Sequence, residues 1–384
     1  AFGLDERVDI LVKKFIDYYP RMTLQNFFVI KHRGKIVASL NLIPEKWSIG
    51  GIPLKVAEMA FAATLAEYRH RGLIRRLVNE FHKHVTNHEY DLSVIEGIPY
   101  FYRQFGYEYA IPIDEQTRIR LDHIPDYEYK HEVRPFTDRD IPKAMQLLKQ
   151  TQKKFYVHSI CDKQIWKMRL ETGIAKECRF EGYAVEEDGE MIAYIRIGEK
   201  PKDKLLMLRE ITDTDQPTAQ TILRFLKDTG KQRGLETLSA HMSYHEPFTE
   251  HLVVIGAVKQ IPPYTWQIRV MDYVKMFKKM KSLFEKYLSA STYKHLTEKL
   301  NFNFYRYTVH VTVEDGTVTD VHKSDSTEDR TMRFSPLVFV QLLLGHRSRE
   351  ELELTYPDFI VRPSHKQLID VLFPKLPSYI HSAY

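Results

Sequence analysis

Apolar positions along the chain follow strand spacing and helix spacing in turn. Residues 59–65 form a short apolar run of strand length, and residues 73–85 carry apolar side chains at the spacing of one helix face. Polar and charged residues fill the opposite face of that helix. The turn between the two segments is basic and ends in Gly72. We therefore predict a strand that leads through a basic turn into an amphipathic helix.

The hydrophobic pattern occurs twice. Residues 28–38 match residues 183–193, and in both cases two apolar strands are joined by a charged turn that ends in glycine, which is typical of a hairpin. The later apolar strands 92–95 and 238–242 also correspond to each other. A unit repeated in this way predicts two tandem domains of the same fold.

The basic turn of the first copy is suited to binding an anion. A helix start presents unpaired backbone N–H groups and a partial positive charge, and phosphate is its usual ligand. Gly72 has no side chain to hold a ligand away from the backbone, and the neighbouring arginines add formal charge. Neither the Walker pattern nor the three-glycine dinucleotide pattern is present. The candidate anion-binding residues are Arg69, His70, Arg71, Gly72, Leu73, Ile74 and Arg75.

The spacing Arg69-x-x-Gly72-x-Ile74 resembles the Gln/Arg-x-x-Gly-x-Gly/Ala loop of GNAT acetyltransferases. In that family the loop grips the pyrophosphate of acetyl-CoA, so the resemblance implies acetyl-CoA as co-substrate. Ile74 departs from the small residue of the family pattern. The resemblance also implies that the end of the preceding strand supplies backbone donors near the thioester. These residues are Ala62, Ala63 and Thr64.

A second segment strengthens the resemblance. The strand 92–95 is followed by Gly97 and Ile98, which the resemblance places beside the cofactor, and then by residues 101–107, which end in Phe-Gly-Tyr. GNAT enzymes have a similar strand and short helix, and a tyrosine at the position of Tyr102 protonates the departing CoA thiolate. A lone tyrosine is more often a packed aromatic. After an Arg-x-x-Gly helix, we favour the catalytic role for Tyr102.

The second copy lacks these groups. Its strand 206–211 leads into residues 212–217, which are acidic, and carboxylates at a helix start repel a pyrophosphate. The basic sequence at 231–234 ends in glycine, but it falls at the predicted helix end, where glycine is a cap. Leu252 stands at the position that matches Tyr102 and cannot donate a proton. We infer one working acetyltransferase-like domain and one degenerate copy.

A third segment follows the repeat. We predict a helix near 276–284, a strand pair at 305–314 and 317–321 that turns at Asp-Gly, and a helix between Ser335 and Gly345. Two GNAT-like units followed by a small α/β domain resemble the Eis (enhanced intracellular survival) acetyltransferases. The third domain of that family is sterol-carrier-like.

The resemblance covers essentially the whole chain and implies an α/β (α+β) fold in three domains. They are a catalytic GNAT domain at 1–125, a degenerate GNAT-like domain at 126–275, and a sterol-carrier-like domain at 276–384. The second copy has an opening strand near 132–135, whereas no counterpart precedes the first hairpin. We therefore expect the start of the protein to be missing from this sequence.

Composition narrows the partners. The chain has 384 residues, 43% of them hydrophobic, which is enough for two or three domains with real cores. The net charge of +5 comes from 56 basic and 51 acidic residues without a basic stripe, so we expect no nucleic-acid partner. No segment approaches the ~20 apolar residues of a membrane span. Cys161 and Cys178 fit neither a zinc site nor a disulfide framework, which favours a cytoplasmic location.

Three other patterns have two interpretations each. His84 and His88, with His82 nearby, suggest a metal site, but the lysine-rich surroundings favour a solvated helix face, and we expect no metal. Residues 275–281 are basic and partly amphipathic, as in a membrane-surface helix or an ordinary surface helix. The apolar residues 337–344 either line a lipid pocket or form core, and we favour core.

The implied reaction is acyl transfer from a thioester to an amine. It needs a neutral amine, hydrogen-bond donors for the oxyanion and a proton for the thiolate. Tyr102 is the predicted acid. The family resemblance implies that the base is the C-terminal carboxylate, here on Tyr384, where the family often has phenylalanine. A carboxylate titrates near ~3.5 in water, so it must act in a desolvated site or through a water.

We predict an acetyl-CoA-dependent N-acetyltransferase of polycationic small molecules such as aminoglycosides. The substrate class and a homo-hexameric assembly both rest on the resemblance. Two alternatives stay open at this point. One is a protein or peptide lysine acetyltransferase with the same fold, and the other is a non-catalytic lipid carrier that uses the third domain.

Overall fold

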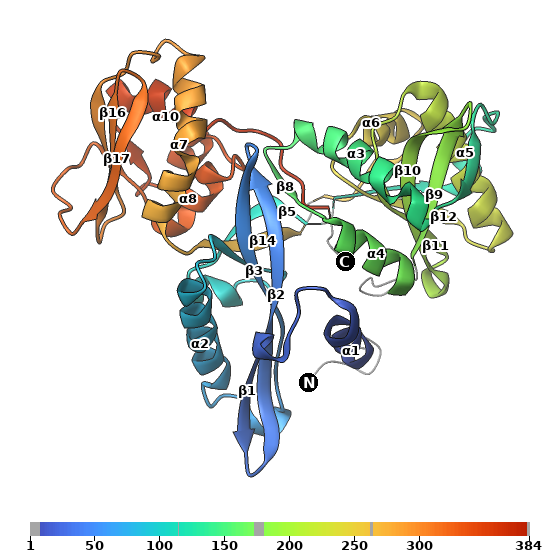
Figure 1. Cartoon of the computed structure of the whole chain (residues 1–384), viewed down its shortest axis with the longest axis horizontal. Helices are drawn as coiled ribbons and strands as arrows, with labels where there is room; N and C mark the ends of the chain where they lie inside the picture. Colours follow the sequence, from blue (N-terminus) through green and yellow to red (C-terminus); the bar gives the residue numbers. More distant parts are fainter. Residues whose placement is uncertain (1–7, 114, 173–179, 262–263, 382–384) are drawn as a thin grey trace.

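The computed structural model describes residues 8–113, 115–172, 180–261 and 264–381. They form three bodies, each built from a sheet with helices packed on it, so the predicted mixed α/β class is confirmed. Figure 1 shows the first body below the centre, the second to the right and the third at the upper left.

The first body contains the first predicted hairpin. Within the described residues its sheet has seven strands, in the order β1-β2-β3-β4-β14-β5 with β8 paired to β2. The strands are β1 (Phe27–His32), β2 (Lys35–Ile49), β3 (Ile52–Thr64), β4 (Leu92–Ile95), β5 (Glu108–Pro112), β8 (Val157–Ser159) and β14 (Thr265–Val270). The hairpin turns at Gly34, whose φ of +81° suits a residue without Cβ.

The second body repeats this layout. In the part of the chain that the structure describes, its sheet also has seven strands, in the order β13-β6-β12-β11-β10-β9-β7. The strands are β6 (Gln116–Arg120), β7 (Glu132–Pro135), β9 (Phe180–Glu187), β10 (Glu190–Lys200), β11 (Leu205–Ile211), β12 (Thr237–His241) and β13 (Val258–Lys259). The antiparallel pair β9–β10 and the parallel pair β11–β12 correspond to β1–β2 and β3–β4, as the internal repeat predicts.

The two sheets exchange strands. β6 follows β5 in the chain but pairs with β12 of the second sheet, while β14 returns after the second body and inserts between β4 and β5. The predicted limits at residues 125 and 275 assign β6 and β14 to the opposite domains from those in which they pair. The apolar pattern of a strand predicts its existence but not its partner, and so it gives no sign of the exchange.

The third body has a smaller sheet. Its five strands, counted within the described residues, follow the order β17-β16-β15-β18-β19. They are β15 (Glu298–Asn303), β16 (Thr308–Glu314), β17 (Thr317–Ser324), β18 (Met332–Arg333) and β19 (Ile360–Val361). Its helices are α7 (Tyr273–Ser289), α8 (Pro336–Leu343), α9 (Arg349–Thr355) and α10 (Lys366–Leu372). Residues 338–344, which form most of α8 and the residue after it, are buried in one core that also contains Trp47 and Trp266 of the first sheet. This confirms that the apolar residues at 337–344 form core.

The helices of the first two bodies cover their sheets. They are α1 (Val8–Tyr18), α2 (Leu73–Asn87), α3 (Ile141–Thr151), α4 (Lys163–Thr172), α5 (Gln216–Gln232) and α6 (Pro247–Val254). Short 3-10 turns are η2 (Leu24–Asn26), η3 (Ala66–Tyr68), η4 (Phe101–Phe105), η5 (Leu121–His123), η6 (Asp138–Asp140), η7 (Gln152–Lys154), η8 (Pro201–Asp203) and η9 (Pro363–His365). α2 buries Leu77, Val78, Phe81 and Val85 against the first sheet, the predicted face. Burying each such side chain contributes roughly 1.5–3 kcal/mol.

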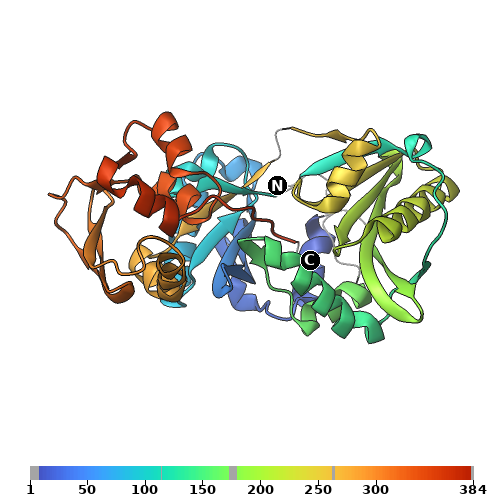
Figure 2. The same ribbon diagram turned by 90° about the horizontal axis from the view of Figure 1, so that it is seen from above.

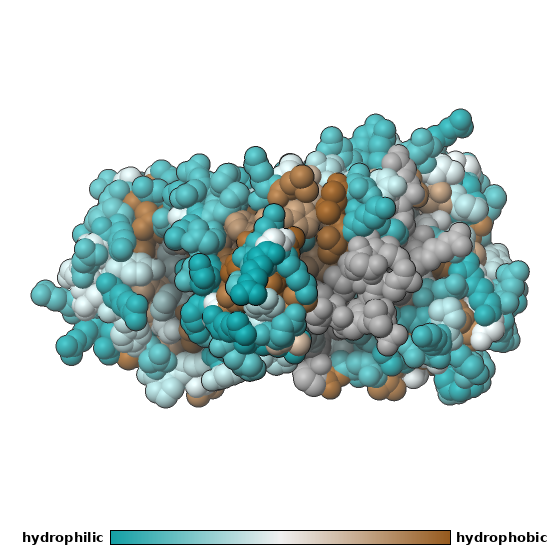
Figure 3. All heavy atoms as spheres, turned by 90° about the horizontal axis from the view of Figure 1, so that it is seen from below, coloured by the Kyte–Doolittle hydropathy of each residue, from teal (hydrophilic) through white to brown (hydrophobic). Residues whose placement is uncertain are grey.

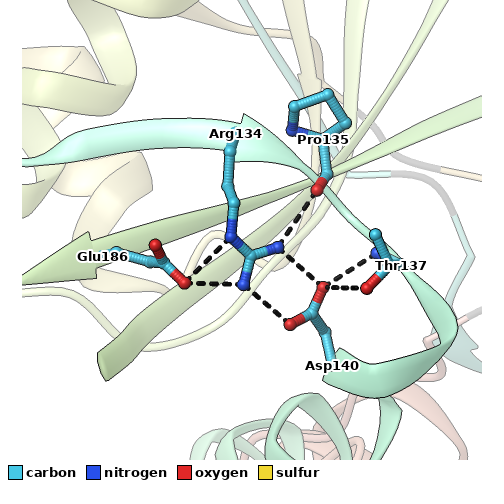
Figure 4. A network of polar contacts seen from close by, with 5 residues as sticks. All are labelled: Arg134, Pro135, Thr137, Asp140 and Glu186. Atoms are coloured by element: carbon cyan, nitrogen blue, oxygen red, sulfur yellow. Dashed lines mark hydrogen bonds and ion pairs between the residues drawn. The ribbon is translucent and has the colours of Figure 1, made fainter. Parts of the chain in front are cut away.

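An arginine fixes β7 at the edge of the second sheet. Arg134 Nη1 and Nη2 donate to the Asp140 carboxylate, each at 2.8 Å, and its Nε donates to Glu186 on β9 at 2.9 Å (Figure 4). The Arg134 guanidinium is the main cause that lowers the pKa of Asp140 to about 2. Such forked, charge-assisted bonds are among the stronger polar contacts. In the first sheet, no strand among the described residues pairs with the outer edge of β1.

The surface is mainly hydrophilic. Seen from below, apolar side chains show beside the hydrophilic end of the first body (Figure 3). Exposed apolar residues on β1, β2 and η2 include Leu24, Val29 and Ile36. Lys279 of α7 contacts Asp91 of the first body at 2.5 Å, so part of this basic helix is used in a contact between the bodies. None of the described helices combines the length and the apolar character that crossing a membrane requires.

Candidate active site

Two strands of the first sheet part where the candidate residues gather. β3 and β4 pair in parallel only between residues 56–58 and 92–94. Beyond that point three steps along β3, from Ala60 to Ala63, face two steps along β2, which defines a bulge. Phe61 lies in this bulge with a φ of +50°, a strained value for an aromatic residue. On the side away from β2, the backbone at Ala62, Ala63 and Thr64 therefore has no paired strand among the described residues, and we call this parting the gap between β3 and β4.

α2 begins at a left-handed glycine. Gly72 is the N-cap, with φ 70° and ψ 13°, and a Cβ added there would meet no atom within 4 Å. The first helical bond runs from the Arg76 N–H to the Gly72 carbonyl at 3.2 Å. The N–H groups of residues 73–75 precede it and are the orphan donors of the helix start. Leu73 and Ile74 pack half-buried on the core below, so their side chains do not cover these donors.

The basic residues of the turn lie around this helix start. The side chains of Arg69 and Arg71 each donate to a backbone carbonyl of the same segment, at 3.5 and 3.0 Å. His70 between them has a φ of 61°, which helps to reverse the chain. Arg75 donates to the Gln104 side chain and so links α2 to η4, the turn that carries Tyr102.

Tyr102 lies on η4 beside the parted strands. Its side chain packs with Phe105 and Tyr107 in the core beneath α2, and the residue is 6% exposed. Burial, and then the nearby Tyr264, raise the pKa of Tyr102 to about 12. A phenol with this pKa keeps its proton at neutral pH, so Tyr102 is held in the form that can donate.

The Tyr102 ring rests on Gly97. A Cβ at Gly97 would lie 2.3 Å from two ring carbons, so only glycine fits there. The Gly97 carbonyl accepts hydrogen bonds from the Tyr264 hydroxyl and from Gln267 Nε2, the latter at 2.9 Å, and the same Nε2 lies 3.4 Å from the Ile98 carbonyl. Sequence reasoning missed Tyr264 and Gln267, because they lie 167 and 170 residues from Gly97 and match no local motif.

The predicted cofactor residues therefore meet at one end of the first sheet, and they fit acetyl-CoA. The Thr64 hydroxyl is buried without a hydrogen-bond partner among the described residues, which is uncommon for a buried polar group and points to a ligand. The uncapped N–H groups after Gly72 suit a pyrophosphate, and the bulge in β3 suits a thioester. Acetyl-CoA would bring the acetyl group and the thiolate leaving group to this gap.

His88 is exposed, as the predicted solvated helix face requires, but His82 departs from that prediction. It is half-buried: Arg269 donates to its Nδ1 at 3.4 Å, and its Nε2 lies 2.9 Å from the Tyr107 hydroxyl. Burial, and then Arg269, lower the pKa of His82 to about 3. The position next to Phe81 at the margin of the apolar face explains the burial. The described residues contain no cluster of His, Cys, Asp or Glu that could hold a metal ion.

The C-terminal tail runs between the first two bodies (Figure 2). The Tyr379 N–H donates to the Val157 carbonyl at 3.0 Å, and Ser159 Oγ donates to the His381 carbonyl at 2.5 Å, so the tail runs parallel to β8. β8 and β3 are both antiparallel to β2. The tail therefore advances in the direction of β3, toward the point where β3 and β4 part. Tyr384, the predicted base, lies outside the described residues.

Comparison with known families identifies the first body. Residues 5–110 match the family model described as an acetyltransferase (GNAT) domain. The parted strands, the glycine-capped helix and the family match together define a GNAT acetyltransferase domain, and GNAT domains use acetyl-CoA. The chain therefore contains a GNAT acetyltransferase domain at residues 5–110. No curated protein matches the sequence.

Solved structures share the fold over the whole chain. A GCN5-related N-acetyltransferase from Anabaena variabilis is 17% identical, with a TM-score of 0.75 over 99% of this chain and 92% of its own. A GCN5-related N-acetyltransferase from Kribbella flavida is 15% identical, with a TM-score of 0.70 over 100% and 99%. Eis1 from Mycobacterium abscessus is 11% identical, with a TM-score of 0.63 over 100% and 99%. At these identities the likeness shows the fold, and it agrees with the Eis resemblance of the sequence.

Proposed function

We propose that this protein transfers an acetyl group from acetyl-CoA to an amine of a polycationic small molecule such as an aminoglycoside. The observation that carries the proposal is the glycine-capped start of α2 beside the gap between β3 and β4. The helix start binds the pyrophosphate through the N–H groups of residues 73–75. The bulge at Phe61 presents backbone donors to the thioester oxygen, where negative charge develops during attack.

Tyr102 supplies the proton for the departing thiolate. Its pKa of about 12 keeps it protonated, but a free thiol titrates near ~8.5, so full transfer to a free thiolate is unfavourable. Tyr102 therefore acts while the C–S bond breaks, when its hydrogen bond stabilises the charge that develops on sulfur. The Gly97 surface holds its ring in place for this step.

The C-terminal carboxylate on Tyr384 removes the proton from the attacking amine. The direction of the described part of the tail supports this role, because residues 379–381 run in the direction of β3, toward the gap between the strands. His381 itself is buried, and burial is the main cause that lowers its pKa to about 4. Desolvation raises the pKa of a carboxylate, so a buried C-terminal carboxylate would be a stronger base than one in water.

Two buried carboxylates support a cationic substrate. Glu45 on β2 and Glu58 on β3 are 5% and 3% exposed. Glu45 pairs with Val56, which lies two residues from Glu58, so both carboxylates belong to one face of the sheet. By resemblance to the Eis family we further propose a hexamer, a sterol-carrier-like third domain and a cytoplasmic location. Analytical ultracentrifugation tests the assembly.

A CoA-release assay tests the reaction and its substrate class. Purified protein with acetyl-CoA should release CoA with an aminoglycoside at a higher kcat/KM than with a lysine peptide. The reverse order would make the protein a peptide lysine acetyltransferase. If none of the amines tested gives CoA release and the protein binds a fatty acid, the lipid carrier is favoured. The buried side chains of α8 argue against an open lipid pocket.

A C-terminal extension tests the base. Residues added after Tyr384 displace the carboxylate without changing any internal side chain, so they should abolish turnover, whereas the same residues added at the N-terminus should not. An unchanged melting temperature separates loss of the base from loss of tail packing. Full activity of the extended protein at that melting temperature would rule out the C-terminal carboxylate.

A further inference from the structure

Gln267 stands where the strand exchange meets the candidate acid. It belongs to β14, is fully buried and pairs with Ile95 on one side and with Tyr109 of β5 on the other. Its Nε2 donates to the Gly97 carbonyl at 2.9 Å and lies 3.2 Å from the Tyr264 hydroxyl, which donates to the same carbonyl. Two side chains from the segment that returns to the first body after the second thus hold one backbone carbonyl beside β4.

The held backbone is the surface that supports the Tyr102 ring. Two ring carbons of Tyr102 would touch a Cβ at Gly97, so a shift of Gly97 moves the ring with it. The hydrogen bonds to the Gly97 carbonyl therefore affect the position of the Tyr102 ring, because the ring packs on Gly97. A displacement of about 1 Å at a reacting group is enough to lower turnover roughly a hundredfold.

Packing alone does not account for a glutamine at this position. Its Oε1 is buried and has no hydrogen-bond partner among the described residues. A buried amide with one unpaired atom is a less stable choice than an apolar side chain of similar size. The donated bond to Gly97 is what the amide provides and an apolar side chain lacks.

We infer that Gln267 is a positioning residue for Tyr102, with Tyr264 as its companion; the role rests on the proposed acetyl transfer. Through Gln267, strand β14, which joins the first sheet after the second body, also determines the position of Tyr102. The catalytic geometry of the first body then depends on the chain having completed the second.

The test compares Gln267→Met with Gln116→Met. Gln116 lies on β6, the other exchanged strand, which pairs with β12 in the second sheet as β14 pairs with β4 in the first. It therefore belongs to the second body, which does not contain Tyr102. Gln267→Met should lower kcat roughly ten- to a hundredfold, with the KM for acetyl-CoA changed by less than about twofold because the helix start is untouched. Gln116→Met should leave both unchanged.

Gln267→Glu gives a readout that a purely structural role does not. The protonated acid can donate to the Gly97 carbonyl, whereas the carboxylate repels it, so kcat relative to wild type should rise as the pH falls. The 19F resonance of Tyr102 in fluorotyrosine-labelled protein, assigned by its absence in Tyr102→Phe, should move in Gln267→Met and stay in Gln116→Met.

The outcomes separate the two claims. Wild-type turnover and an unmoved resonance in Gln267→Met would overturn the positioning role and leave the acetyltransferase intact. Absence of acetyl transfer in the wild-type protein would overturn the proposed function, and the resonance would still decide whether Gln267 positions Tyr102.

Discussion

The two GNAT-like bodies begin their principal helices in opposite ways. α2 starts at Gly72, whose lack of a side chain leaves the first N–H groups free for a ligand. α5 starts at Asp215, whose carboxylate accepts from the Thr218 N–H at 3.0 Å. The second helix thus satisfies its own donors and places a negative charge where a phosphate would bind. The same fold offers an anion site in one copy and closes it in the other.

The two bodies also differ at the point where their parallel strands part, β3 from β4 in the first and β11 from β12 in the second. β11 and β12 pair only from residues 205–208 to 237–240, so they also part. Beyond that point Lys154 Nζ donates to Glu246 at 2.6 Å and also contacts Asp213, and the Tyr379 hydroxyl donates to the His241 carbonyl at 3.1 Å. The region beyond the point where β11 and β12 part is thus occupied by polar side chains and by the C-terminal tail. The comparison supports the proposal that the first body reacts, because a few positions, and not the fold, distinguish the two copies.

Tyr102→Phe should produce the largest effect. The substitution keeps the ring and its packing on Gly97 but removes the proton donor, so kcat should fall by roughly two to four orders of magnitude, while acetyl-CoA affinity barely changes. A CoA-release assay measures kcat, and calorimetric titration measures the affinity for acetyl-CoA. Tyr194→Phe is the matched control, because Tyr194 is a buried tyrosine of the second body. Equal losses in both variants would remove the distinction between the bodies.

Gly72→Glu should weaken acetyl-CoA binding on the order of a thousandfold. A carboxylate at the helix start faces the pyrophosphate, and such like-charge contacts cost several kcal/mol. Gly72→Ala is the control: it imposes the same backbone strain at positive φ, but its methyl group enters open space. Calorimetric titration with acetyl-CoA should find near-normal affinity in Gly72→Ala. Tight binding by Gly72→Glu would refute the pyrophosphate assignment.

His82 makes the first body sensitive to acid. Its folded pKa is about 3, below the ordinary 6.5, so from pH 6.5 downward the unfolded chain takes up a proton that the folded chain does not. Stability should therefore fall as the pH drops through this window, by about 1–2 kcal/mol at pH 5 after allowance for partial solvent exposure. Urea midpoints at pH 7.5 and 5 measure it.

His82→Gln should remove that part of the pH dependence. A glutamine can still donate to Tyr107 and accept from Arg269, but it does not titrate. His123→Gln changes an exposed histidine and should leave the dependence as in the wild type. An identical pH profile in His82→Gln would show that other groups cause the acid sensitivity.

Local patterns in the sequence predicted the elements that short segments define. The helical spacing after Gly72 gave α2, the two charged glycine turns gave both hairpins, and the acidic residues 212–217 gave the start of α5. Tyr102 was proposed as the acid because its neighbours form a motif along the chain. Each of these signals lies within about twenty residues, so periodicity and turn chemistry suffice to detect it.

The sequence did not predict which strands pair over long distances along the chain. β6 and β14 have ordinary strand patterns, and only the tertiary structure decides in which sheet they pair. For the same reason Gln267 and Tyr264 gave no sign of a role at Gly97. The positive φ of Phe61 is likewise imposed by the mismatch of β2 and β3, since nothing about an aromatic residue predicts it.

Asp215→Ala should give the smallest effect and sharpen the comparison from the other side. Loss of the N-cap should destabilise the second body by about 1 kcal/mol, seen as a lower urea midpoint, and Asp215→Ser should restore most of it. Acetyl-CoA affinity and turnover should not change in either variant, because the helix start of α5 takes no part in the reaction. A large loss of acetyl-CoA binding in Asp215→Ala, at a normal urea midpoint, would mean that the second helix start binds the cofactor. The roles assigned to the two bodies would then have to be exchanged.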